Sequence, residues 1–259
     1  MELQRVVIVG SGNLAEALAL AVAQSDAQLV QLFARNRQRG PEVARLAGTG
    51  WSDDPQQLAR ADLYLLAVSD RAVAEVAAAL PIPATAVVAH TAGSVPLEAL
   101  ARYERRGVFY PLQTFTAGRR VDFSTIPVFL EAADPDLLAR LEAFARRLTR
   151  TVYRLDSQQR ARMHLAGVFA CNFVNAMYAA GEELVARAGL DFEVLKPLLA
   201  ETAAKACATA SPRSVQTGPA VRGDRPTQER HEALLADDPQ LQTLYRMISK
   251  QIWETSKKI

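Results

Sequence analysis

The sequence has few cysteines and histidines. Cys171 and Cys207 are the only cysteines among 259 residues, they form no Cys-x-x-Cys motif, and the three histidines are scattered. This excludes a disulfide framework, and without clustered carboxylates we expect no metal site. Gly-x-Ser-x-Gly and Gly-Lys-Ser/Thr motifs are also absent, which argues against a hydrolase nucleophile elbow and a phosphate-binding P-loop.

The sequence also lacks an excess of either charge and any long apolar run. Thirty Lys and Arg against 28 Asp and Glu leave a net charge of +2, which gives no footprint for nucleic acid or an anionic membrane. Charged residues break every apolar run before the ~18 residues that a membrane span needs. The N-terminus has no basic segment or cleavage site typical of a signal peptide. We therefore expect a reduced, cytoplasmic protein with no nucleic-acid or membrane partner.

What is present is the composition of a globular protein, with 49% hydrophobic and 22% charged residues. In the first half, short β-branched apolar runs alternate with segments of helix formers, which predicts right-handed crossovers and a mostly parallel sheet. The strands are expected at residues 5–9, 29–34, 63–68, 86–89, 108–112 and 126–130. Helix starts are expected before Leu58 and at Asp134-Pro135.

The second half predicts helices. Residues 158–188 are almost all helix formers, residues 211–225 form a loop rich in Pro, Gly and Ser, and a last amphipathic helix is expected over 241–252. A strand is indicated only near residues 152–155. The predicted fold is an α/β Rossmann-like domain with a doubly wound, mostly parallel sheet over residues 1–155, followed by an all-α domain over residues 156–259.

The strongest functional signal is a glycine motif after the first strand. Gly10-Ser-Gly-Asn-Leu-Ala matches G-x-G-x-x-G/A between a strand and a helix, the context that dinucleotide binding requires. The free N–H groups at the start of the helix can bind a pyrophosphate. The predicted cofactor residues here are Gly10, Ser11, Gly12, Asn13 and Leu14. The alternative is a plain glycine turn.

The end of the second predicted strand indicates which dinucleotide binds. NAD-dependent enzymes usually place an acidic residue there, but residues 28–40 contain none and instead include Arg35, Asn36 and Arg37. A guanidinium group suits the 2′-phosphate of NADP, because it can donate paired hydrogen bonds. The sequence therefore favours NADP(H), with a solvated basic loop as the alternative.

Two further strand ends are expected near the cofactor, because ligands of open α/β sheets bind at the carboxyl ends of the strands. Ala67, Val68 and Ser69 follow the third strand, and His90 and Thr91 follow the next. All five are predicted cofactor residues. For His90, a hydrogen-bonded structural histidine is an equal alternative.

Several motifs together resemble a known superfamily. They are Gly-Ser-Gly-Asn-Leu-Ala at 10–15, Leu-Leu-Ala-Val-Ser-Asp at 65–70, His-Thr-Ala-Gly-Ser at 90–94, Gly-Val-Phe-Tyr-Pro-Leu-Gln-Thr-Phe at 107–115 and Thr-Gly-Pro-Ala-Val-Arg-Gly-Asp at 217–224 with His231. The first three resemble the pyrroline-5-carboxylate reductase and 6-phosphogluconate dehydrogenase-like superfamily. The others resemble bacterial proteins labelled NADP oxidoreductases, whose C-terminal domain has no assigned function. The resemblance covers nearly the whole chain and implies a Rossmann domain, a helical domain and a helix-mediated homodimer.

The resemblance also implies where a catalytic group would be expected. Ketopantoate reductases and hydroxyacid dehydrogenases of this superfamily use a Lys on the first long C-terminal helix, with an Asn one turn later. This chain has no Lys within residues 158–188 but has His164 and, eight residues on, Asn172. An ideal helix separates the two by about 80°, so they can share a face. Our hypothesis is that His164 donates a proton and Asn172 orients the substrate; the alternative is two satisfied structural side chains.

Two other residues are weaker candidates. Arg222, in the loop of residues 211–225, could bind a substrate carboxylate, or it could pair with Asp224 or with a partner subunit. Tyr110 could reach the nicotinamide, although a core tyrosine is favoured. The sequence thus predicts an NADP(H)-dependent oxidoreductase for a small carbonyl or imine substrate bearing a carboxylate. The alternative is a non-catalytic NADP(H)-binding sensor or scaffold protein.

Overall fold

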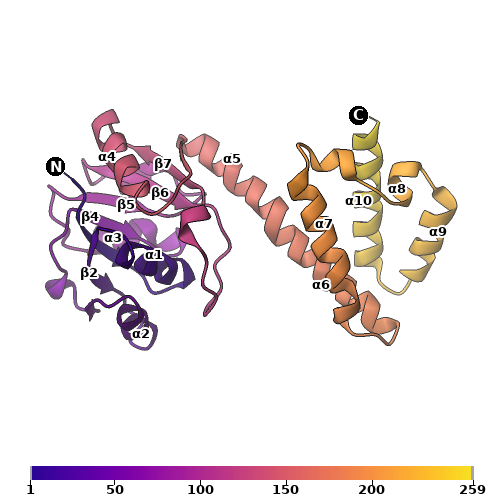
Figure 1. Cartoon of the computed structure of the whole chain (residues 1–259), viewed down its shortest axis with the longest axis horizontal. Helices are drawn as coiled ribbons and strands as arrows, with labels where there is room; N and C mark the ends of the chain where they lie inside the picture. Colours follow the sequence, from indigo (N-terminus) through magenta and orange to yellow (C-terminus); the bar gives the residue numbers. More distant parts are fainter. Residues whose placement is uncertain (1, 258–259) are drawn as a thin grey trace. The chain divides into compact units, whose positions relative to one another are not determined.

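The computed structural model describes residues 2–257, and within them eight strands form one sheet in the order β3-β2-β1-β4-β5-β6-β7-β8 (Figure 1). Neighbouring strands are parallel except for the antiparallel pair β6 and β7. The strands are β1 (Arg5–Val9), β2 (Gln28–Phe33), β3 (Trp51–Ser52), β4 (Leu63–Leu66), β5 (Val87–His90), β6 (Arg106–Pro111), β7 (Val128–Ala132) and β8 (Val152–Arg154). The predicted Rossmann-like sheet is confirmed. Strand β3 was not predicted, because two residues give no periodicity.

Helices cover both faces of this sheet. They are α1 (Asn13–Ala23), α2 (Arg39–Leu46), α3 (Val73–Ala79) and α4 (Pro135–Ala145), with 3₁₀ turns η1 (Pro55–Gln57), η2 (Asp70–Ala72), η3 (Leu97–Leu100) and η4 (Phe123–Thr125). In β1, Val6 and Ile8 pack with α1, α2 and α4, whereas Val7 and Val9 pack with α3. This alternation is the reason that strands of a doubly wound sheet are apolar throughout.

Two aspartates, Asp54 and Asp134, were predicted to begin helices, and both cap a helical turn in the structure. Asp134 begins α4 as predicted, because its Oδ1 accepts a hydrogen bond from the backbone amide of Leu137 at 2.8 Å. Asp54 likewise accepts from the amide of Gln56 at 2.9 Å, but only the single turn η1 follows, where the sequence predicted a helix. Helix α2 was not predicted, since Gly and Pro in its first turn conceal it.

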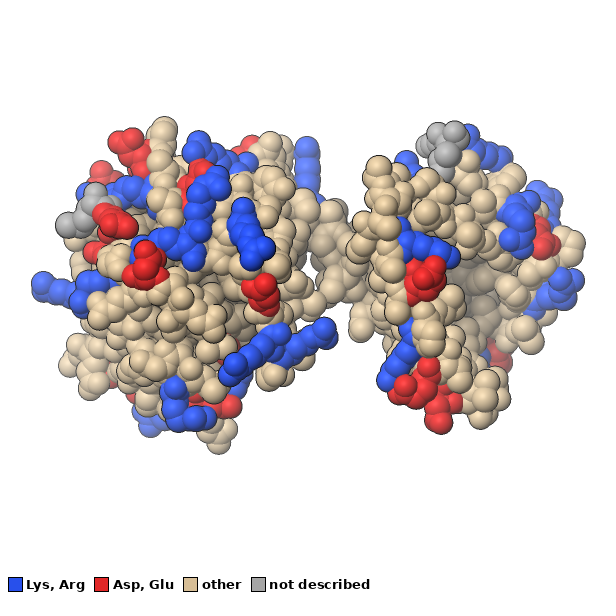
Figure 2. Space-filling model, viewed as in Figure 1, with Lys and Arg blue, Asp and Glu red and all other residues tan. Residues whose placement is uncertain are grey.

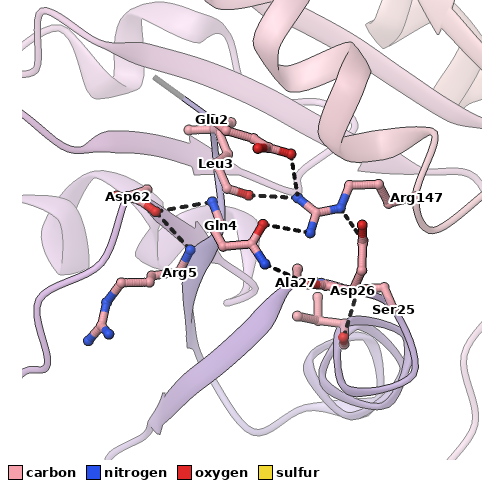
Figure 3. A network of polar contacts seen from close by, with 10 residues as sticks. Glu2, Leu3, Gln4, Arg5, Ser25, Asp26, Ala27, Asp62 and Arg147 are labelled. Carbon is pink, nitrogen blue, oxygen red and sulfur yellow. Dashed lines mark hydrogen bonds and ion pairs between the residues drawn. The ribbon is translucent and has the colours of Figure 1, made fainter.

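The amino ends of the strands are held by a polar network on the edge opposite the glycine motif (Figure 3). Arg147 donates to the carbonyl of Leu3 at 3.1 Å and to Oε1 of Gln4 at 2.9 Å, and it also pairs with Asp26. Asp62 accepts from the backbone amide of Gln4 at 3.0 Å. These contacts fix the first strand in the sheet and leave its carboxyl end for the site described below.

After β8, the described residues contain helices and turns but no strand, as predicted. They are α5 (Ser157–Gly167), the π-helical turn η5 (Val168–Asn172), α6 (Phe173–Arg187), η6 (Phe192–Leu195), α7 (Lys196–Ala208), η7 (Pro212–Val215), α8 (Pro219–Arg222), α9 (Arg225–Leu234) and α10 (Pro239–Ser256). The predicted loop over residues 211–225 is corrected, because η7 and α8 lie within it. Among residues 2–257, no helix combines the length and apolar character that crossing a membrane requires.

Contacts along the chain define two compact units, the first ending at Asn172 and the second beginning at Phe173. The first unit thus includes α5, which the sequence assigned to the helical domain. The reason is Arg160 on α5, whose side chain is 1% exposed and pairs with Glu131 of β7. It also donates to the carbonyl of Val95. The predicted division of function between residues 1–155, which would bind the nucleotide, and residues 156–259, which would bind the substrate and form the dimer, stays a prediction.

Candidate functional site

The turn after β1 forms an open cradle. Gly10 has φ +124°, and a Cβ there would lie 2.2 Å from the carbonyl oxygen of Ala67, so only glycine fits. Gly12 has φ −73°, and a Cβ there would meet nothing within 4 Å. Helix α1 begins at this point without a side-chain cap, so the amides of its first turn have no protein partner from a capping residue. Open space beside such amides fits a phosphate group.

A groove of about 360 Å³ extends from this cradle along the carboxyl edge of the sheet. It brings together Gly10, Gly12, Arg35, Ala67, Val68 and Ser69 from the predicted set. Ser11, Asn13, Leu14, Asn36, Arg37, His90 and Thr91 are not among its lining residues. Leu14 packs against the core, so only its backbone faces the turn.

The arginines at the end of β2 have different surroundings. Arg35 lines the groove with a 75% exposed side chain, and its Nη1 lies 3.8 Å from Glu75. The Nε of Arg37 donates to Asp53 at 2.6 Å. Asp53 also lines the groove, and the sequence analysis missed it, because it follows β3 and not β2. Strand β3 pairs with β2 and so places Asp53 at the same edge of the sheet. Recognising β3 in the sequence would have identified Asp53 as a candidate groove residue.

Two predicted asparagines have structural contacts. The Oδ1 of Asn36 accepts from the backbone amides of Gln38 and Arg39 at 3.0 and 2.9 Å, and so orders the turn before α2. Asn13 donates from Nδ2 to the carbonyl of Phe115 at 2.9 Å. Their side chains are thus engaged, although the amide of Asn13 still lies in the first turn of α1.

His90 and Thr91 are buried at the carboxyl end of β5. Thr91 donates from Oγ1 to the carbonyl of Leu66 at 3.2 Å, and His90 Nδ1 accepts from the amide of Ala92 at 3.2 Å. Burial, with the positive charge of Arg160 acting in the same direction, lowers the pKa of His90 to about 4. The histidine is therefore neutral at pH 7. The Thr91 side chain joins the end of β5 to β4, whereas the His90 side chain contacts the turn that follows β5.

A second cavity, of about 430 Å³, lies beside the end of β6. Its lining residues are Tyr110, Leu112, Gln113, Thr114, Phe115, His164, Gly167, Val168, Ala170, Cys171 and Asn172. The two predicted catalytic residues, His164 and Asn172, thus line one cavity. The turn η5 between them is π-helical, so the spacing of an ideal α-helix does not apply here; π turns are frequent at functional sites.

The histidine of this cavity has a phenol partner. The hydroxyl of Tyr110 and Nδ1 of His164 share a hydrogen bond of 3.1 Å, and the rings meet edge to face at 68°. Gly93 closes the space around the pair, since a Cβ there would lie 2.6 Å from His164 Nδ1. Burial raises the pKa of Tyr110 to about 12, and the charge of Asp70 acts in the same direction. The core position that the sequence favoured for Tyr110 is confirmed, since its side chain is buried and packs with Val108 and Phe129. The sequence did not indicate its hydrogen bond to His164, which is 54 residues away.

Arg222 lies in α8 of the second unit, apart in sequence from every residue of this cavity. Its side chain is 65% exposed, and Nη2 lies 3.9 Å from Asp224, one of the alternatives that the sequence left open. Its role in substrate binding stays a prediction. Among residues 2–257, no group of three or more His, Cys, Asp or Glu could hold a metal ion.

Comparison with known proteins places the chain in a family. Residues 5–93 match the family described as NADP oxidoreductase coenzyme F420-dependent, and residues 126–252 match a domain of unknown function, DUF2520. A "putative NADP oxidoreductase" from Bacteroides fragilis is 39% identical, with a TM-score of 0.89 over 97% of this chain and 98% of that chain. No curated protein matches the chain.

Two further solved structures are similar in fold alone. A protein from Thermotoga maritima has 21% identity and a TM-score of 0.76, over 98% of each chain. A 1-pyrroline-5-carboxylate reductase from Streptococcus pyogenes has 14% identity and a TM-score of 0.66, again over 98% of each chain. From the motifs, the fold and the relative in Bacteroides fragilis, the chain belongs to the NADP oxidoreductase family, and in it this N-terminal domain is followed by a DUF2520 domain.

Proposed function

We propose that the protein is an NADP(H)-dependent oxidoreductase that reduces a carbonyl or imine group of a small molecule bearing a carboxylate. One observation carries the proposal: a glycine cradle and a cavity containing the Tyr110–His164 pair lie at the carboxyl ends of strands in one sheet. Ligands of open α/β sheets bind at this edge. The pyrroline-5-carboxylate reductase among the structural relatives supports the substrate class.

The cofactor would be held by the chain's own backbone and by Arg35. The open space at Gly12 and the uncapped start of α1 suit the pyrophosphate. Arg35 is exposed in the groove and can bind the 2′-phosphate, whereas Arg37 is partly neutralised by Asp53. This difference favours Arg35 as the residue that selects NADP(H). When bound, the reduced nicotinamide supplies a hydride.

The protein must supply a proton, because hydride addition to a carbonyl leaves a negative charge on the oxygen. In this proposal His164 gives that proton from Nε2, since Nδ1 is engaged with Tyr110. Asn172 lines the same cavity and orients the substrate through its amide. The lining of this cavity contains no Lys or Arg within residues 2–257, so the group that binds the substrate carboxylate is not among its lining residues.

The first experiment is a fluorescence titration of NADPH and NADH. Alanine at both Arg35 and Arg37 should weaken NADPH binding by about tenfold or more, since each charged hydrogen bond contributes about 1.5–3 kcal/mol. The control is Arg45→Ala, on α2 outside the groove. Failure to bind either nucleotide would overturn the proposal.

Turnover is then measured with ketopantoate and pyrroline-5-carboxylate in wild type and in His164→Gln. Loss of a specific reduction in the variant supports the enzyme. Nucleotide binding with no turnover across a carbonyl and imine panel favours the alternative, a sensor or scaffold.

We also propose that the protein forms a homodimer through its second unit. Large apolar side chains are exposed there, including Val194, Leu198, Leu234 and Met247 with 53%, 61%, 76% and 65% exposure. In Figure 2, much of the visible surface of that unit between its acidic and basic side chains is uncharged. Such surfaces mark interaction sites, and a second copy is the commonest partner. Light scattering should give a dimer mass, and Leu198→Glu should lower it; a monomeric wild type contradicts the proposal.

A further inference from the structure

The hydroxyl of Tyr110 has one hydrogen-bond partner among the residues that the structure describes, Nδ1 of His164 at 3.1 Å. The tyrosine is 8% exposed. A Cβ at Gly93 would lie 2.8 Å from Tyr110 Cζ and 2.6 Å from His164 Nδ1, so the backbone of Gly93 packs closely against the pair. Among the described residues, Nδ1 of His164 is therefore the acceptor within reach of this hydroxyl.

This geometry decides which group donates. A hydroxyl carries one proton, and leaving it without an acceptor in a buried position costs about 1–3 kcal/mol. If Nδ1 of neutral His164 carried a proton, it would donate to the hydroxyl oxygen, and the hydroxyl proton would have no acceptor. If the hydroxyl donates, Nδ1 is the acceptor, and the imidazole proton lies on Nε2. The second arrangement satisfies both groups.

We propose that Tyr110 is a positioning residue, which donates its hydroxyl proton to Nδ1 of His164 and so fixes the neutral imidazole with its own proton on Nε2. The inference rests on the proposed role of His164 as proton donor. When the Nε2 proton moves to the substrate oxygen, the hydroxyl proton moves from Tyr110 to Nδ1. The imidazole stays neutral, and the negative charge rests on the phenolate until the Nδ1 proton returns to Tyr110 and a proton from solvent is taken up at Nε2.

The charges around the pair are consistent with this transfer. Arg160, on the same helix as His164, lowers the pKa of Tyr110 and so favours the phenolate, whereas burial and Asp70 raise it. The resulting pKa of about 12 keeps the hydroxyl protonated at neutral pH. A neutral His164 alone would have to become an anion to give up its proton; with Tyr110 it does not.

The test is ¹⁵N NMR of the histidine side chains in the free protein. The chain has three histidines, so the signals can be assigned by single substitutions. At pH 8, His164 should show an unprotonated Nδ1 and a protonated Nε2, and Tyr110→Phe should produce a mixture of both tautomers. The matched control is Tyr245→Phe in the second unit, where the hydroxyl lies 2.9 Å from Nδ1 of His231. It should alter the signals of His231 and leave those of His164 unchanged.

A protonated Nδ1 in wild-type His164, or an unchanged tautomer in a folded Tyr110→Phe variant, would overturn the inference. This readout needs neither cofactor nor substrate, so it stands apart from failure of the proposed function, which titration and turnover would show. If a substrate is turned over, Tyr110→Phe should lower kcat by about 100-fold, the lower end of general acid catalysis, with little change in KM. A change confined to KM would contradict the relay.

Discussion

The side chain of Asn13, the first residue of α1, donates a hydrogen bond of 2.9 Å to the backbone carbonyl of Phe115, 102 residues further along the chain. Phe115 lines the cavity that contains His164. The glycine turn and the wall of this cavity are thus joined directly. Asn13 therefore has two roles: its backbone amide lies in the first turn of α1, and its side chain holds the cavity wall.

Asn13→Ala should loosen that wall. A hydrogen bond of this kind contributes about 1 kcal/mol, so we expect amide hydrogen exchange in residues 112–116 to become about fivefold faster. NADPH affinity should change less, because the backbone of the turn is kept. Asn36→Ala is the control, since that side chain contacts the start of α2 instead. Equal exchange rates in wild type and Asn13→Ala would refute the link.

The two glycines of the turn should respond differently to alanine. Gly10→Ala forces a Cβ to 2.2 Å from the Ala67 carbonyl oxygen at φ +124°, and we expect a loss of stability of about 2 kcal/mol or more. Gly12→Ala meets nothing within 4 Å and should cost about 1 kcal/mol or less.

The Cβ at residue 12 should nevertheless weaken NADPH binding, because it occupies the space proposed for the pyrophosphate. Melting temperature and NADPH titration, measured on both variants, separate the two effects. A stable Gly12→Ala protein with unchanged affinity would show that the turn does not hold phosphate.

Removing one partner of the ion pair between Arg160 and Glu131 should destabilise the first unit more than removing both. The side chains are 1% and 15% exposed, so Arg160→Met leaves a largely buried carboxylate without its cation, and we expect a loss of about 3–5 kcal/mol. Adding Glu131→Gln to the Arg160→Met variant should restore part of the lost stability. The control Arg146→Met removes an exposed partner of Glu142 and should cost about 0–1 kcal/mol. Urea denaturation measures all three, and similar losses for Arg160→Met and Arg146→Met would contradict the expectation.

His90 should make stability depend on pH. Its pKa is about 4 in the folded protein against an ordinary 6.5, so as pH falls below 6.5 the unfolded chain takes up a proton that the folded protein refuses. The contribution is therefore complete above pH 6.5 and is lost as pH falls toward 4. The difference corresponds to about 2.5 kcal/mol between pH 7.5 and 4.5.

The measurement is urea denaturation at both pH values in wild type and in His90→Asn. The decrease on acidification should be smaller in the variant by about that amount. A His231→Asn variant should retain the larger decrease. The same decrease in all three proteins would show that His90 is not the group responsible.

All strands but β3, the glycine turn and the helical second half could be predicted from the sequence alone, because these depend on local patterns. Arg5–Val9 is a strand through its β-branched run, and Gly10 is required by the backbone of its own turn. His164 and Asn172 could be chosen because they lie on one predicted helix. A resemblance in several motifs added the family, which the comparisons confirmed.

Which side chains meet could not be predicted, because the contacts join residues far apart in the sequence. Asp53 reaches the groove because β3 pairs with β2, and Tyr110 meets His164 because β6 and α5 lie together, 54 residues apart in sequence. His90 is buried where the sequence predicted a cofactor contact, since its exposure depends on the elements packed around it. Local patterns are set by neighbours within a few residues, whereas hydrogen-bond partners, burial and pKa values depend on segments that only folding brings together.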